Sequence, residues 1–168
     1  NYIKPEFVKP IIERVNGTVV ECNTAYAGSR NTTSKHEALM EKHGWSKYFD
    51  VDNMDQAGPD LVLDIPNIKI IKKNYVGKNL TNYDSLLVLS HFKGHPMGGY
   101  GGTLKQLSIG CASSSIHNMF NNNIKYINVM TNILVDYDCC AKAEDPCMKD
   151  IDILSSIDPI DIYQACID

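Results

Sequence analysis

Apolar residues recur along the chain at two spacings, and each spacing predicts a kind of element. From Pro5 to Val15 they fall at steps of three and four, which is the pattern of one helical face. Pro5 suits the first turn of that helix, and Asn16-Gly17 should end it. The β-branched run Thr18 to Cys22 then predicts a short strand. A second helix is expected from Thr33 to His43, terminated by Gly44 in a left-handed conformation.

The later part of the chain continues the alternation of strands and helices. Leu86 to Ser90 lies in a nearly continuous apolar run, as is typical of a parallel strand covered on both faces. Thr103 to Gly110 is expected to form a helix, and Asp158 with Pro159 should open the last one as cap and first turn. Five further short runs predict strands: Leu61 to Ile65, Ile68 to Ile71, Tyr126 to Met130, Ile133 to Tyr137 and Ile151 to Leu154.

This alternation favours a single α/β domain over residues 1–168, with a mainly parallel sheet and helices on both faces. The chain begins at Asn1 instead of a methionine and stops inside an apparent helix at Asp168. We therefore expect a fragment of a larger domain, with a first strand and a C-terminal part missing. The asparagine-rich stretch 113–123 has no clear period, which predicts a mobile loop or a gap there.

Composition excludes several classes of partner. The net charge of −4 and the pI near 5.7 argue against a nucleic-acid surface. No apolar stretch approaches the roughly 20 residues of a membrane helix, and no secretory leader is present, so we expect a cytoplasmic protein with no membrane partner. In that compartment all six cysteines should be reduced. They are Cys22, Cys111, Cys139, Cys140, Cys147 and Cys166.

The chemistry-bearing residues concentrate between His91 and Lys105. We expect this glycine-rich segment to connect an interior strand, Leu86 to Ser90, directly to the helix at Thr103. An antiparallel hairpin there would contradict both the predicted fold and the site argument that depends on it. Ligands of open α/β sheets bind at such strand ends. His91, His95 and Lys93 are the candidates for catalysis, because histidine titrates near neutral pH.

The same segment supplies candidate ligands, together with Arg30 from a loop after the first strand. A pocket formed by Asn23 to Arg30 and His91 to Lys105, with His117, would hold an anion or a metal ion. The metal candidates are His91, His95 and Cys111. The ligand-binding candidates are Arg30, Gly98, Gly99, Gly101, Gly102 and Lys105. A tight turn also explains the glycines, and packing in the core also explains Cys111.

Standard nucleotide and zinc patterns are incomplete in this segment. Gly99 and Gly101 have no third glycine at Leu104, as a dinucleotide loop would need, and no G-x-x-x-x-G-K-[ST] run occurs. His91 and His95 are four apart, but in a predicted loop, so the geometry of helical zinc proteases does not apply.

Five stretches of the chain resemble one known family. They are Cys22 to Arg30, Leu89 to His95, Gly98 to Lys105, Gly110 to Ser113 and Asp150 to Pro159. Together they resemble the bacterial and archaeal domain of unknown function 362, over nearly the whole chain. Two positions depart from the family pattern: Gln106 stands where asparagine is common, and Tyr163 where aspartate is common.

The resemblance implies little about chemistry. Members are often described as iron–sulfur centre proteins, and many carry a ferredoxin-like module with a C-x₂-C-x₂-C-x₃-C-P run. No such run occurs here, so the cofactor stays unknown, with a metal ion or an iron–sulfur cluster as the options. Three hypotheses stay open: a metal- or iron–sulfur-associated redox enzyme or redox partner, a non-redox binding domain for phosphate or carboxylate, and a scaffold for a ferredoxin-like module.

Overall fold

The computed structural model describes residues 2–25, 27–58, 61–65, 70, 72–95, 98–111, 119–120, 123–134 and 145–168, with the side chains of 109–111 excepted. Contacts divide the chain into two compact units, Ile3–Tyr83 and Asp84–Asp168. Within the described residues, no helix is both long and apolar enough to cross a membrane.

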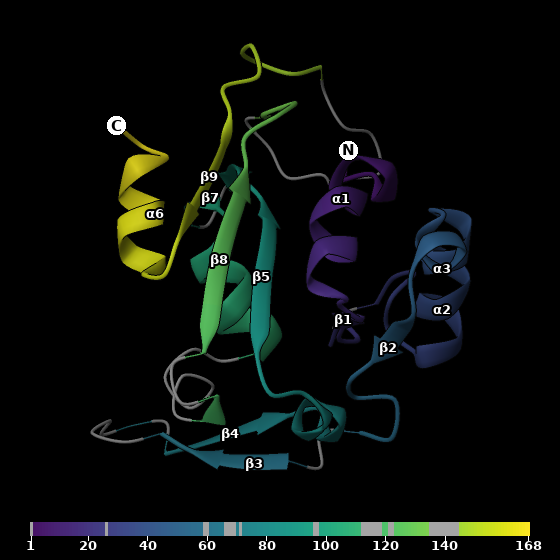
Figure 1. The fold of residues 1–168 in the computed structure, drawn as a ribbon. Helices are drawn as coiled ribbons and strands as arrows, with labels where there is room; N and C mark the ends of the chain where they lie inside the picture. The colour runs from purple at the N-terminus through teal and green to yellow at the C-terminus, as the bar shows by residue number, and fades with distance from the viewer. Residues whose placement is uncertain are drawn as a thin grey trace. The chain divides into compact units, whose positions relative to one another are not determined.

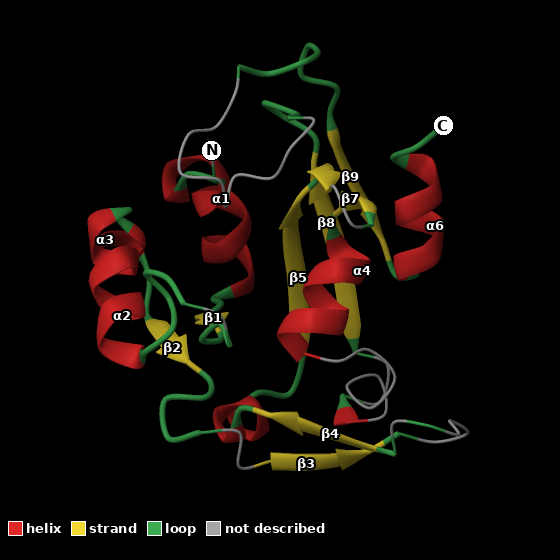
Figure 2. Cartoon of the chain, turned by 180° about the vertical axis from the view of Figure 1, so that it is seen from behind, coloured by secondary structure: helices red, strands yellow, loops and turns green. Residues whose placement is uncertain are grey.

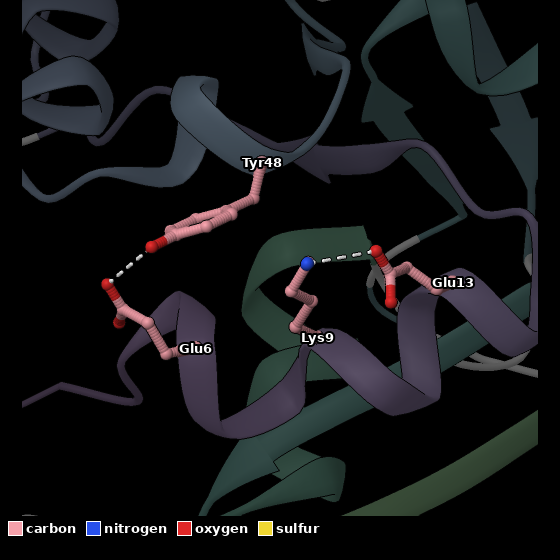
Figure 3. A network of polar contacts seen from close by, with 4 residues as sticks. All are labelled: Glu6, Lys9, Glu13 and Tyr48. Atoms are coloured by element: carbon pink, nitrogen blue, oxygen red, sulfur yellow. Dashed lines mark hydrogen bonds and ion pairs between the residues drawn. The ribbon is translucent and has the colours of Figure 1, made fainter.

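The N-terminal unit begins with the predicted helix. Helix α1 (Pro5–Val15) has proline in its first turn and ends at Asn16, which is left-handed with φ 49°. Figure 3 shows two polar contacts of its exposed side. Glu6 accepts a hydrogen bond from Tyr48 at 3.2 Å, and Lys9 and Glu13 form an ion pair at 3.3 Å.

Two more helices follow in this unit. The predicted second helix is confirmed as α2 (Thr33–Lys42), and Gly44 after it is left-handed with φ 83°, as expected. Because glycine has no Cβ, it adopts this conformation without steric cost. A four-residue helix, α3 (Trp45–Tyr48), begins directly afterwards and is too short for its period to be visible in the sequence.

The strands of the N-terminal unit form two pairs. Strand β1 (Val19–Glu21), which was predicted, pairs in parallel with β2 (Val51–Asn53), which was not. Strand β3 (Leu61–Asp64) pairs antiparallel with β4 (Lys73–Val76). The predicted strand Ile68 to Ile71 lies outside the described residues except for Ile70. A 3₁₀ helix, η1 (Lys78–Asn82), closes the unit.

The C-terminal unit contains a three-stranded sheet in the order β5-β8-β9 (Figure 1). Strand β5 (Leu86–His91) is parallel to β8 (Ile124–Val129), and β9 (Ile153–Ser156) is antiparallel to β8. The predicted strand from Ile133 was wrong at Ile133 and Leu134, which are not strand, while residues 135–137 lie outside the described part.

Two helices cover this sheet. Helix α4 (Thr103–Lys105) begins where predicted and continues as a π-helical segment, η2 (Gln106–Cys111). Helix α6 (Pro159–Ala165) is capped as expected, because the Asp158 carboxylate accepts from the amides of Ile160 and Asp161. Figure 2 shows α4 in front of β5 and β8, and α6 beside β9.

The α/β composition is confirmed, but the expectation of a mainly parallel sheet is wrong. The described strands form two parallel pairings and three antiparallel ones. Strand β5 lies at an edge of its sheet, so the prediction of an interior strand is also wrong within the described residues. Along β5, Val88 and Ser90 are buried and the other residues are half-buried.

The predicted direct connection from β5 to α4 is wrong as well. Strands β6 (Lys93–His95) and β7 (Gly99–Gly101) form an antiparallel hairpin between them. Gly99 has φ 76°, which lets the chain reverse at this point. Glycines on both strands leave no hydrophobic alternation, so the sequence contained no strand pattern to recognise.

The thiol prediction concerns six cysteines, of which the structure describes three side chains. Cys22, Cys147 and Cys166 form no disulfide within the described residues. Cys139 and Cys140, and the side chain of Cys111, lie outside the described residues.

Candidate functional site

The β6–β7 hairpin is held against the end of the β5–β8 sheet by backbone hydrogen bonds. Phe92 donates to the Val129 carbonyl at 3.0 Å, and Gly94 donates to the Leu134 carbonyl at 2.7 Å. Within the hairpin, the Gly98 amide donates to His95 Nδ1 at 3.1 Å. The His95 ring is therefore oriented by its own turn, with Nδ1 as acceptor and the proton of the neutral ring on Nε2.

Three basic side chains gather at this hairpin. Lys93, His95 and Lys105 are each half-buried. Partial desolvation, then the charge of Lys105 and then that of Lys93, hold the pKa of His95 below its ordinary value. Lys105 passes along β7, because a Cβ added to Gly101 would lie 3.3 Å from its Cδ. We call Lys93, His95 and Lys105 the basic cluster.

His91 makes a different contact from His95. Its Nε2 lies 2.6 Å from the Thr131 carbonyl oxygen, in the segment that follows β8. Among the described residues, no group of three or more His, Cys, Asp or Glu side chains could hold a metal ion. Because the Cys111 side chain is outside those residues, the metal set His91, His95 and Cys111 stays a prediction.

The four candidate glycines have different structural roles. Gly99 requires a left-handed backbone, with φ 76°. At Gly102 a Cβ would lie 3.1 Å from both Asn128 Oδ1 and Phe92 Cδ2, so close packing requires glycine there. At Gly98 a Cβ would meet His95 Nδ1 at 3.6 Å and the Tyr100 carbonyl oxygen at 3.8 Å, and at Gly101 it would meet the flexible Lys105 side chain. Turn geometry and packing thus account for Gly99 and Gly102 without a ligand.

The backbone amide at the start of α4 already donates a hydrogen bond within the protein. Thr103 N donates to Asn128 Oδ1 at 3.1 Å, and Asn128 Nδ2 donates to Cys166 Sγ at 3.2 Å. Thr103 and Asn128 are both fully buried. The anion site expected at the backbone amides that begin α4 therefore has one hydrogen-bond donor fewer. The basic side chains of Lys93, His95 and Lys105 are then the stronger candidates for contacts with an anion.

Several residues around the hairpin were missed by the sequence analysis. Tyr163 donates from its hydroxyl to the Tyr100 carbonyl at 3.0 Å, and the two rings lie 4.7 Å apart. The Ser90 hydroxyl hydrogen-bonds to Gln106 Oε1. Both positions that depart from the family pattern thus make contacts between elements: Gln106 ties η2 to β5, and Tyr163 ties α6 to β7. The one available signal was Asn128, a polar residue inside an apolar strand.

Arg30 belongs to the N-terminal unit, whereas the basic cluster belongs to the C-terminal one. The expected shared pocket of Asn23 to Arg30 with His91 to Lys105 therefore stays a prediction. His117, its third component, lies outside the described residues.

Comparison with known proteins gives one match. A family model described as a domain of unknown function, DUF362, matches residues 1–168. No curated protein matches the chain, and no solved structure does.

Proposed function

The chain belongs to the domain of unknown function 362 family over residues 1–168, and we propose that it binds an anionic small molecule. The family description assigns no chemistry, so the proposal comes from the site itself. The β6–β7 hairpin and the start of α4 bind the anion through the basic cluster. The ligand carries a phosphate or carboxylate group. We also propose a cytoplasmic location for this binding.

The observation that supports the proposal is the proximity of Lys93, His95 and Lys105. The charges of Lys105 and Lys93 both lower the pKa of His95, and Lys105 lies along β7, where a Cβ added to Gly101 would be 3.3 Å from its Cδ. An anion bound near these positive charges is stabilised by them. The oriented His95 ring adds an N–H donor at Nε2, which becomes a charged donor on protonation.

A metal or iron–sulfur role is less well supported by these contacts. A metal cation at His95 would meet the charges of both lysines, and His91 hydrogen-bonds to Thr131 instead of facing the hairpin. The redox hypothesis therefore rests on the family resemblance and on the predicted ligand Cys111.

Isothermal titration of the full chain with inorganic phosphate and with citrate tests the proposal. We expect saturable binding of at least one anion, weakened about tenfold or more in Lys105→Gln, because loss of a charge-assisted hydrogen bond costs roughly 1.5–3 kcal/mol. Lys125→Gln is the matched control, since Lys125 is exposed on β8 in the same unit and outside the cluster. Absence of anion binding together with stoichiometric binding of Zn²⁺ or Fe²⁺ would favour the metal hypothesis instead.

A further inference from the structure

A second polar cluster lies in the N-terminal unit, where the parallel strands β1 and β2 end. Asn53 is the last residue of β2, and its Nδ2 donates to Asn23 Oδ1 at 2.9 Å. Asn23 follows β1 by two residues and donates from its backbone amide to Asp55 Oδ1 at 2.9 Å. Its Nδ2 donates to Thr33 Oγ1 at 3.1 Å, which ties the cluster to the first residue of α2. Ligands of α/β folds bind at such strand ends.

One atom of this cluster lacks a partner. Asn53 is 4% exposed, and its Oδ1 accepts no hydrogen bond from any described residue. Because the amide nitrogen of the same side chain is committed to Asn23, this oxygen is directed away from that contact. A buried acceptor with no donor is costly and needs an explanation. A ligand carrying an N–H or O–H group supplies one.

A half-buried cation, Arg30, lies next to the cluster, because its carbonyl accepts a hydrogen bond at 2.8 Å from the amide of Thr24, the residue after Asn23. The charge of Arg30 acts on the carboxyl of Glu21, whose pKa is raised by burial and lowered in part by Arg30. It also acts on His36, whose pKa is lowered by burial first and by Arg30 second, and raised by Asp55. The described residues include no ion-pair partner and no side-chain hydrogen bond for the Arg30 guanidinium. The planar guanidinium group of Arg30 can donate two parallel hydrogen bonds to a carboxylate.

A buried histidine, His36, also belongs to this cluster. Its side chain is 2% exposed, and Nδ1 lies 3.3 Å from Asn23 Oδ1. His36 is a residue of helix α2, which has ten residues and no side chain capping its first turn. The unpaired first-turn amides of a helix favour an anionic group. Glu21 and Asp55 disfavour a ligand with several negative charges, so a single carboxylate fits better than phosphate.

We propose that Asn23, Arg30, His36 and Asn53 form a binding site for a small carboxylate that carries a neighbouring hydroxyl or amino group. The carboxylate pairs with Arg30 near the start of α2, and the hydroxyl or amino group donates to Asn53 Oδ1. This site is independent of the basic cluster, because it lies wholly in the other unit.

The test is an NMR titration of the full chain with glycolate, glycine and acetate, followed at the side-chain amide signals of Asn23 and Asn53. Glycolate or glycine should shift these signals saturably, and the two acids separate a hydroxyl donor from an amino donor. Acetate should bind at least tenfold more weakly, because it leaves the buried oxygen without a donor.

Two variants complete the test. Arg30→Gln should reduce affinity at least tenfold, whereas Lys35→Gln, which removes an exposed charge from α2, should leave it unchanged. Flat titrations with all three acids, equal binding of acetate, or unchanged affinity in Arg30→Gln would each overturn the proposal; Asn53 Oδ1 would then be met by water alone. Lys105→Gln should not alter these shifts, so failure here is distinguishable from failure at the basic cluster.

Discussion

At the scale of single residues, His95 connects the electrostatics of the hairpin to a pH dependence. Its pKa is depressed by partial desolvation and by Lys105 and Lys93. A bound anion stabilises the imidazolium and raises that pKa, so the complex binds more protons than the free protein. Affinity for an anion whose own charge stays constant over this range, such as sulfate, should therefore increase as pH falls through the range between the bound and free pKa values, and level off below both.

The pH dependence can be checked by following the His95 ring protons by NMR from pH 5 to 8, with and without phosphate. In Lys105→Gln the free pKa should move upward toward the ordinary histidine value, because one of its depressing charges is gone. A His95 pKa unaffected by both phosphate and Lys105→Gln would contradict the proposed cluster.

The sequence singled out residues that lie at the hairpin but did not show their partners. Spacing alone placed His91, Lys93 and His95 together, yet it could not show that His91 contacts Thr131, forty residues away. Likewise, Arg30 was predicted to be an anion ligand from its loop, whereas Asn23, His36 and Asn53 were not. Their association depends on the β1–β2 pairing, and β2 is only three residues long.

At the scale of elements, the helices were more predictable than the strands. Helices α1 and α2 are followed by left-handed residues, Asn16 and Gly44, that the sequence marks as helix ends, and both helices fall at the predicted residues. Strands β2, β6 and β7 have three residues each, too few for an alternating pattern to stand out. The mixed sheet forms because strands that are far apart in the sequence pair with each other. The residue pattern within one strand does not show which strand it pairs with.

A glycine at the junction of β4 and η1 gives a prediction about element packing. A Cβ added to Gly77 would lie 2.3 Å from the carbonyl carbon and oxygen of Met54, just after β2. Because the clash is with backbone, Gly77→Ala should destabilise the protein by about 1–3 kcal/mol. Urea unfolding measures this directly. The control is Gly28→Ala, whose added Cβ meets nothing within 4 Å; equal stability of the two variants would show that Met54 does not pack against Gly77.

At the scale of the whole molecule, the thiol state tests the expected reducing environment. Cys22, Cys147 and Cys166 form no disulfide within the described residues, and Cys147 is exposed while the other two are half-buried. All six cysteines should react with a thiol reagent in denaturant without added reductant. In the folded protein Cys147 should react first, and Cys147→Ser should remove that fast phase. Fewer than six reactive thiols after denaturation would indicate a disulfide and an oxidising compartment.

At this scale, we expect phosphate to bind to the unit that contains the basic cluster, Asp84–Asp168, and not to Ile3–Tyr83. The most direct measurement is a ¹H–¹⁵N NMR titration of the full chain with inorganic phosphate, read at every assigned backbone amide. We predict saturable shifts concentrated at Lys93 to His95, Gly98 to Gly101 and Lys105, with the signals of Ile3–Tyr83 unchanged. Shifts that do not saturate, or that scatter over exposed lysines such as Lys125 without favouring the hairpin, would contradict the proposed anion site.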